Sequence, residues 1–234
     1  MSGRIADELA GIDLGDKRLN RRSLKVIEAL SSDPAASING SIETWSDTLA
    51  AYRLFDNASV TPEAILKPHY QATMARIIEE PVVLIVQDTT ELDFTTHPPT
   101  NAGCLNKAER FGLYNHTHLA VTPAGLALGV VDVRTFDRPV ESLGKTRERR
   151  PLPIEEKESF RWLEGYRLAG KVSEHCPPTQ IVNVADREAD IYDTFMEAQQ
   201  DPEATHADFV IRSKEHRCTN ERIPPSEHGT RNAV

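Results

Sequence analysis

Two aspartates follow apolar runs of the kind that form buried strands. Asp88 comes just after Val82–Val86, and Asp186 comes directly after Ile181–Ala185. An acid at the end of a hydrophobic strand is costly to desolvate, but strand ends of α/β sheets are where ligands and metals gather. Carboxylates suit Mg²⁺, which usually takes one or two of them from a protein, and paired ions assist phosphoryl transfer. Spacing alone does not separate this metal site from the plainer alternative, that each Asp is a helix cap or turn residue.

A second set of candidate residues is basic. The segment Lys17–Leu30 has helical periodicity, with Asp16 as a plausible N-cap. At about 100° per residue its cations gather on one face and its apolar residues on the other. We expect the basic face to carry no acid. Its cations are Lys17, Arg18, Arg21, Arg22 and Lys25. Clustered cations of this kind are typical of contacts with a nucleic-acid backbone, and a solvated helix face is the plainer alternative.

A third candidate is a histidine pair. His116 and His118 alternate along an expected strand and would face one way. They raise the alternative of a different metal hydrolase. No third ligand follows at a familiar zinc spacing, so ordinary strand residues are the simpler interpretation.

The elements that must position these residues fall into two regions. Residues 1–78 are expected to be helical, with helices near Ser46–Phe55 and Thr61–Ile78, and Glu79-Glu80-Pro81 ends the pattern. From Val82 onward the order is strand, hairpin, helix, strand, helix, strand, which predicts an α/β fold with a mixed sheet and flanking helices. The expected strands cover 82–86, 116–121, 126–133, 181–185 and 209–212, the expected helices cover 155–175 and 187–199, and residues 95–115 are expected to form a polar loop. The core would span 79–218, and 219–234 reads as an off-pattern tail.

Composition limits the class of protein. The chain has 234 residues and a formal net charge of −9, which argues against a uniformly basic surface but allows a local basic face. Its three cysteines form no CxxC motif, which favours a reducing compartment. No apolar run approaches the roughly 20 residues that a membrane span needs, and the N-terminus lacks a signal peptide's apolar core. We therefore expect a cytoplasmic, nucleoid-associated protein with no membrane partner.

Several motifs resemble those of one known family. Gln87-Asp88-Thr89-Thr90 and Asp186-Arg187-Glu188-Ala189-Asp190 resemble the first and second catalytic-acid motifs of bacterial insertion-sequence transposases, the DDE cut-and-paste group. The motifs Glu156-Lys157-Glu158-Ser159 and Phe209-Val210-Ile211-Arg212-Ser213-Lys214 also match that family, and Leu14-Gly15-Asp16-Lys17-Arg18 and Ala51-Tyr52-Arg53-Leu54-Phe55 resemble its DNA-end-binding domain.

The resemblance implies a helical transposon-end DNA-binding domain followed by an RNase H-like catalytic core. Asp88 and Asp186 would hold two Mg²⁺ or Mn²⁺ ions for metal-dependent DNA cleavage, through a DNA hairpin, and strand transfer into target DNA. By position, Arg18, Arg22 and Arg53 would contact end DNA, and Arg212 would lie near the active site on the DNA side. Members of this family act on DNA, and we expect a homodimer there.

One departure from the family pattern concerns the third catalytic acid. The family carries a Glu in a tyrosine-arginine-glutamate helix well beyond the second Asp, and no Glu after Asp186 sits in such a motif. We therefore expect a core that is incomplete at the C-terminus, a truncated and weakly active or inactive transposase. The alternatives are a catalytically inactive DNA-binding or inhibitory remnant, and a plain RNase H-type nuclease, which the N-terminal helical region argues against.

Overall fold

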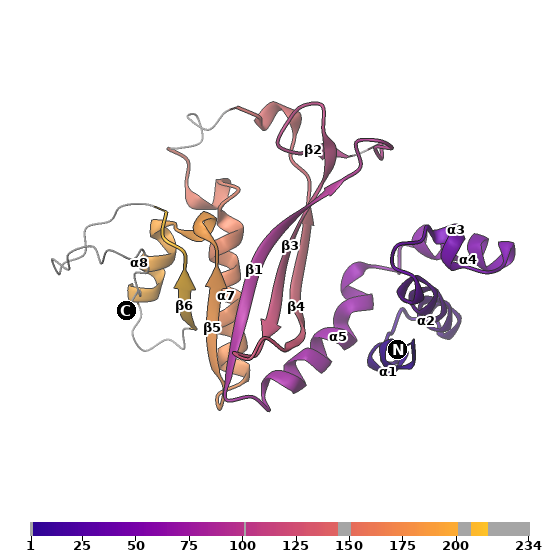
Figure 1. Ribbon diagram of the computed structural model, residues 1–234, viewed down its shortest axis with the longest axis horizontal. Coiled ribbons are helices and arrows are strands. Elements are labelled where there is room, and N and C mark those ends of the chain that lie inside the picture. Colours follow the sequence, from indigo (N-terminus) through magenta and orange to yellow (C-terminus); the bar gives the residue numbers. More distant parts are fainter. Residues whose placement is uncertain (1, 101, 145–150, 201–206, 215–234) are drawn as a thin grey trace. The chain divides into compact units, whose positions relative to one another are not determined.

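The computed structural model describes residues 2–100, 102–144, 151–200 and 207–214 (Figure 1). The chain divides into two compact units, residues 1–75 and residues 76–234. The division falls inside the last helix of the N-terminal region, whereas the sequence analysis set it just after residue 78. The expected tail, 219–234, lies outside the described residues.

The N-terminal unit is helical. Its helices are α1 (Ser2–Glu8), α2 (Lys17–Ser32), α3 (Ile38–Ser41), α4 (Trp45–Phe55) and α5 (Pro62–Ile77), the last of which continues into the second unit. The predicted start of α2 is confirmed, because the Asp16 side chain accepts a hydrogen bond from the Arg18 backbone N–H at 2.6 Å. Two small apolar clusters hold the helices together; they are built on Val26, Ile42, Ala51 and Leu54, and on Leu9, Ile12 and Leu14.

The second unit is built on a six-stranded mixed sheet. Its strands are β1 (Val82–Asp93), β2 (Gly103–Cys104), β3 (Phe111–Val121), β4 (Ala127–Phe136), β5 (Gln180–Ala185) and β6 (Asp208–Ile211). β3 pairs antiparallel with β1 on one side and with β4 and β2 on the other. β5 pairs parallel with β1, and β6 pairs parallel with β5. The expected mixed sheet with flanking helices is confirmed (Figure 1).

The β3–β4 connection is the predicted tight turn. Gly125 N–H donates to the Thr122 carbonyl at 2.9 Å, and Gly125 has φ of 86°, which favours glycine. The expected polar loop over 95–115 is wrong in part, because β2 and the first residues of β3 lie there. Those residues lack a clear apolar alternation, and their strand conformation comes from pairing with the far end of β1, as in Leu92 opposite Leu113.

One face of the sheet is covered by a helix. After the 3₁₀ turns η1 (Val140–Ser142) and η2 (Ile154–Glu156) comes α7 (Phe160–His175), and η3 (Arg187–Ala189) and α8 (Tyr192–Gln200) follow β5. The predicted helix begins later than Glu155, because Lys157 is extended and ends the η2 turn. Trp162 of α7 packs with Ala185 and Ala189 in a buried cluster.

Buried and less buried side chains alternate along β1, and the buried ones face α7. Val83, Ile85 and Gln87 are buried, whereas Leu84 and Val86 are half-buried and Asp88 is exposed. Since successive side chains of a strand point to opposite faces, Asp88 belongs to the face opposite α7. Among the described residues, no helix has the length and apolar character needed to cross a bilayer.

Candidate two-aspartate site and basic groove

Asp88 lies inside β1 rather than at its end. The strand continues to Asp93, so the expectation that the strand ends with its apolar run, next to the acid, is wrong. The extension holds because Thr89–Asp93 pair with His116–Gly112 of β3. The residues before and after Asp88 are therefore paired with β3, which holds the backbone of Asp88 in place. Its side chain is exposed.

Asp186 is positioned as the sequence suggested, directly after β5. Its backbone is extended, and its side chain accepts a hydrogen bond from the Glu188 backbone N–H at 2.7 Å as the N-cap of η3. Asp186 is thus both a strand-end acid and a cap. The cap fixes the orientation of the carboxylate, whose oxygens have further lone pairs for another partner.

The two aspartates are brought level by the β1–β5 register. Val86 pairs with Val184 in the parallel ladder, and the same register continued two residues further puts Asp88 opposite Asp186. Neighbouring strands lie about 4.8 Å apart. Asp88 and Asp186 share the alternation of Val86 and Val184, which points away from α7, so the register directs both exposed carboxylates to the same face of the sheet.

Arg212 directly follows β6, the strand next to β5 in the sheet. Its backbone N–H donates to the Ala185 carbonyl at 3.2 Å, just beyond the last β5–β6 pair, Ala185 with Ile211. The register therefore places Arg212 opposite Asp186, and its side chain is exposed. One edge of this face carries two carboxylates and one guanidinium in a row.

The donor chemistry of the two-aspartate site fits a hard divalent cation. Carboxylate oxygens are the ligands that Mg²⁺ prefers, and Mg²⁺ commonly takes one or two from the protein and completes its shell with water or phosphate oxygens. Within the described ranges, no group of three His, Cys, Asp or Glu side chains is close enough to hold a metal ion. Asp88 and Asp186 could hold such an ion as a pair.

The histidine pair lies on the opposite, covered face. His116 and His118 are both buried, and their rings meet edge to face at 4.8 Å. Burial lowers the pKa of His116 to about 3, and burial likewise lowers the pKa of His118. Asp132 is the acid nearest to His118, at 3.6 Å from Nδ1, too far for a hydrogen bond. Because the described part of the chain places no third ligand beside this pair, the histidines do not support the metal-hydrolase alternative.

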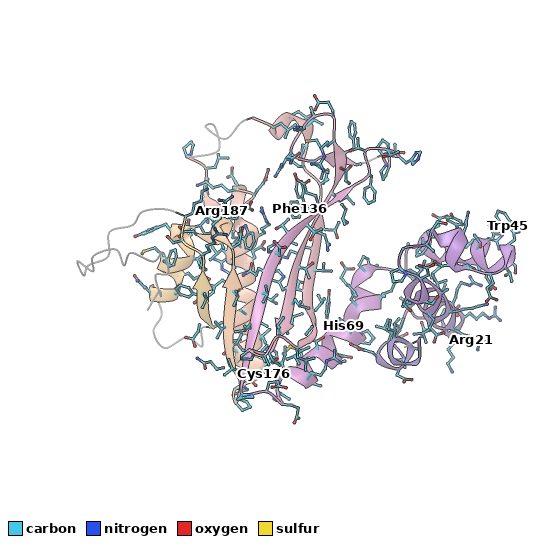
Figure 2. All side chains as sticks on the ribbon, viewed as in Figure 1. Arg21, Trp45, His69, Phe136, Cys176 and Arg187 are labelled. Atoms are coloured by element: carbon cyan, nitrogen blue, oxygen red, sulfur yellow. The ribbon has the colours of Figure 1, made fainter. Side chains whose placement is uncertain are left out.

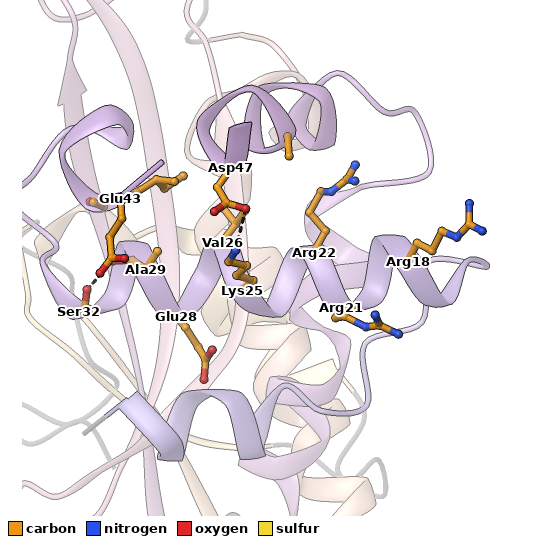
Figure 3. Close-up of a pocket in the computed structure, with 13 residues that line it drawn as sticks. Arg18, Arg21, Arg22, Lys25, Val26, Glu28, Ala29, Ser32, Glu43 and Asp47 are labelled. Carbon is orange, nitrogen blue, oxygen red and sulfur yellow. Dashed lines mark hydrogen bonds and ion pairs between the residues drawn. The ribbon is translucent and has the colours of Figure 1, made fainter. Parts of the chain in front are cut away.

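The cations of α2 line a groove in the N-terminal unit (Figure 3). The groove has a volume of about 740 Å³ and lies between α2, the segment Ser41–Glu43 and the first turns of α4. Arg18 and Arg21 are exposed and Arg22 is half-buried. Of the five expected cations, those that line the groove are Arg18, Arg21, Arg22 and Lys25.

The expectation of an acid-free face is wrong. Glu28 lines the same groove, because it follows Lys17 by about three helical turns and so returns to the same side of α2. Lys25 is also paired, since its Nζ lies 2.7 Å from Asp47 Oδ1 of α4. The hydrogen bond from Lys25 lowers the pKa of Asp47 below its ordinary value. The basic character is concentrated at the Arg18–Arg22 end.

α4 carries the remaining predicted DNA contact. Arg53 is exposed in the last turn of α4 and does not line the groove. The same helix presents large aromatic side chains to solvent. Trp45, at its start, is 76% exposed, and Tyr52 is 44% exposed (Figure 2).

Sequence reasoning also missed a buried arginine behind the two aspartates. Arg161 of α7 donates to Thr89 Oγ1 at 3.2 Å and to Glu188 Oε2 at 2.8 Å. These partners are distant in sequence and come together only through the packing of α7 on the sheet. No local pattern in the sequence marks Arg161 as part of the site.

A comparison with known families gives one finding that bears on this site. Residues 1–60 match the family model described as transposase DNA-binding. The match covers α1 to α4, and therefore the basic groove, and ends before the sheet unit begins. The match suggests that the N-terminal unit binds DNA as part of a transposase.

Proposed function

We propose that this chain is a DDE-type transposase of an insertion sequence. Its N-terminal unit binds transposon-end DNA, and its sheet unit is an RNase H-like core for metal-dependent cleavage and strand transfer into target DNA. The proposal rests on the parallel β1–β5 register, whose last pair is Val86 with Val184: Asp88 and Asp186 each lie two residues beyond that pair, and both side chains are exposed.

The strand order supports the RNase H-like assignment. An antiparallel set, β4-β3-β1, is followed by two parallel strands, β5 and β6, which are reached through α7 and α8. The acids then occupy the first strand and the end of the next parallel strand, as the motifs around Asp88 and Asp186 imply.

The residues of the site have separate tasks in this proposal. Asp88 and Asp186 would hold Mg²⁺ or Mn²⁺, because carboxylate oxygens are the ligands that these ions prefer. A bound divalent cation activates the attacking oxygen and stabilises the leaving one. Arg212, level with Asp186, attracts the DNA phosphate to that edge through charge-assisted hydrogen bonds.

The N-terminal unit supplies affinity for the DNA backbone. Arg18, Arg21 and Arg22 present cations that can neutralise phosphates, whereas Lys25 is already paired with Asp47. These contacts position the DNA, and base contacts would have to specify the end sequence.

One observation favours a second candidate function, DNA binding without catalysis. The described residues offer two carboxylates at the site and no group of three His, Cys, Asp or Glu side chains that could hold a metal ion, and removing one member of a catalytic set commonly costs orders of magnitude in rate. Such a chain would occupy element ends and inhibit an active transposase. A gel shift and a nicking assay on the same end DNA separate the two functions.

The proposed metal site can be tested without the end sequence. Mn²⁺ binding to the full chain is measured by electron paramagnetic resonance for the wild type and for Asp88→Asn, Asp186→Asn and Asp193→Asn. Asp193 is an exposed acid of α8 and serves as the matched control. We expect both site variants to lose Mn²⁺ binding and the control to keep it. Unchanged binding in Asp88→Asn and Asp186→Asn would contradict the proposal.

A further inference from the structure

The residues on either side of the two aspartates meet behind the sheet. Gln87 and Thr89 flank Asp88 and point toward α7, because side chains alternate along β1. Asn183 of β5 points the same way, and Glu188 follows Asp186 in η3. Their contacts tie the two strands together on the side opposite the carboxylates.

The first set of contacts that joins β1 to β5 is a chain of hydrogen bonds between side chains. Gln87 Nε2 donates to Asn183 Oδ1 at 2.5 Å, which joins β1 to β5. His116 Nε2 lies 3.3 Å from Gln87 Oε1, and His116 Nδ1 lies 2.8 Å from Thr89 Oγ1. A hydrogen bond between neutral buried groups loses little to solvent competition, so these bonds fix Gln87 and Thr89, and through them the backbone at Asp88.

The second set of contacts passes through Arg161. Its Nε donates to Thr89 Oγ1 at 3.2 Å, its Nη2 to Glu188 Oε2 at 2.8 Å, and its Nη1 to the Glu158 carbonyl at 2.6 Å. The side chain is only 15% exposed, and its guanidinium lies 5.3 Å from the centre of the Trp162 ring. A planar guanidinium held at several points cannot change direction without breaking one of these bonds.

The charge of Arg161 also reaches the site. Burial lowers the pKa of Arg161, and the negative charges of Glu188, Glu158 and Asp186 act against that lowering. Arginine stays protonated in proteins. Arg161 is therefore a cation whose charge interacts with the carboxylate of Asp186.

We propose that Arg161 is a positioning residue for the two-aspartate site. By joining Thr89, next to Asp88, to Glu188, two residues after Asp186, it holds the two carboxylates at the separation that one divalent cation needs. The inference rests on the proposed function, since it assumes that Asp88 and Asp186 bind the ion. Partners of this kind, which touch the neighbours of metal ligands rather than the metal, typically change metal affinity by roughly 10- to 100-fold.

The test compares two arginines of the same helix. Arg167 of α7 pairs with Glu197 through two bonds of 2.7 Å, but on α8 and away from the aspartates, so Arg167→Met is the matched control. Mn²⁺ affinity of the full chain is measured by electron paramagnetic resonance, beside thermal unfolding. We expect Arg161→Met to weaken Mn²⁺ binding by roughly tenfold or more and Arg167→Met to leave it unchanged. Arg161→Lys keeps the charge but not the fork geometry, so its loss should be intermediate.

A second variant keeps the inference testable if Arg161→Met does not fold. Thr89→Val preserves shape and removes the hydroxyl that accepts from Arg161, so it should weaken Mn²⁺ binding in the same direction by a smaller factor. If Arg161→Met, or in its place Thr89→Val, binds Mn²⁺ as tightly as Arg167→Met, the positioning role is wrong. If Asp88→Asn itself keeps full Mn²⁺ binding, the proposed function fails instead, and the two failures are distinct.

Discussion

Gly165 of α7 lies directly against the side-chain amide of Gln87 on β1. A Cβ at position 165 would overlap Gln87 Oε1 and the ring of His118, so only glycine allows this approach. Gln87 is the neighbour of Asp88, and the helix also carries Arg161. A change in the distance between α7 and the sheet would therefore move Gln87 and Arg161, which lie next to the two-aspartate site.

Gly165→Ala should destabilise the sheet unit. In an open helical position, replacing glycine by alanine stabilises by up to about 1 kcal/mol. At this position the added methyl group overpacks a buried layer, which typically costs about 1–3 kcal/mol. Urea unfolding monitored by Trp fluorescence gives the sign directly. A more stable variant would show that α7 does not pack closely against β1 and β3 at this position.

Acid should destabilise the protein through His116. Its pKa is about 3 when folded, against an ordinary value of 6.5, so the unfolded state binds more protons between these values. The contribution of His116 to stability is therefore complete above about pH 6.5 and lost as pH falls toward 3, at about 1.4 kcal/mol per pH unit. His116→Gln should reduce the slope of unfolding free energy against pH in this window by about one proton. His175→Gln changes the same residue type at the exposed end of α7 and is the matched control.

Arg22 and Lys25 should contribute unequally to DNA binding. Each phosphate contact lowers log K by about 0.9 per unit of log salt concentration. Arg22→Ala should reduce the magnitude of that slope by about this amount on a mixed-sequence duplex. Lys25→Ala should reduce it less, because Lys25 is paired with Asp47 at 2.7 Å.

Asp47→Asn should have the opposite effect on DNA binding. It removes the partner of Lys25, so the freed cation should raise DNA affinity at low salt. Fluorescence anisotropy over a series of salt concentrations measures both effects. Equal losses in Arg22→Ala and Lys25→Ala, together with no gain in Asp47→Asn, would contradict the role given to the groove.

The parts of the fold that were predictable from sequence have local causes. α2 was predicted because its periodicity and its Asp16 cap lie within one segment, and β5 because an apolar run ends sharply at Asp186. The extension of β1 from Thr89 to Asp93 was missed because its polar residues become a strand only by pairing with β3, far along the chain.

The candidate site shows the same limit. Two apolar runs indicated two strands, but their adjacency and register depend on the order of the whole sheet. Arg161 could not be found from sequence, because its partners Thr89 and Glu188 lie on different elements. The acid on the basic face, Glu28, could have been found by counting three turns from Lys17.

Iron-mediated backbone cleavage can show whether Asp88 and Asp186 bind one divalent cation together. Fe²⁺ replaces Mg²⁺ in oxygen-ligand sites, and with ascorbate and peroxide it cuts the protein backbone next to the bound ion. We expect cuts near residue 88 and near residue 186 in the same preparation, and both should be abolished in Asp88→Asn and in Asp186→Asn. Cuts at only one of these places, or a pattern that survives in both variants, would contradict it.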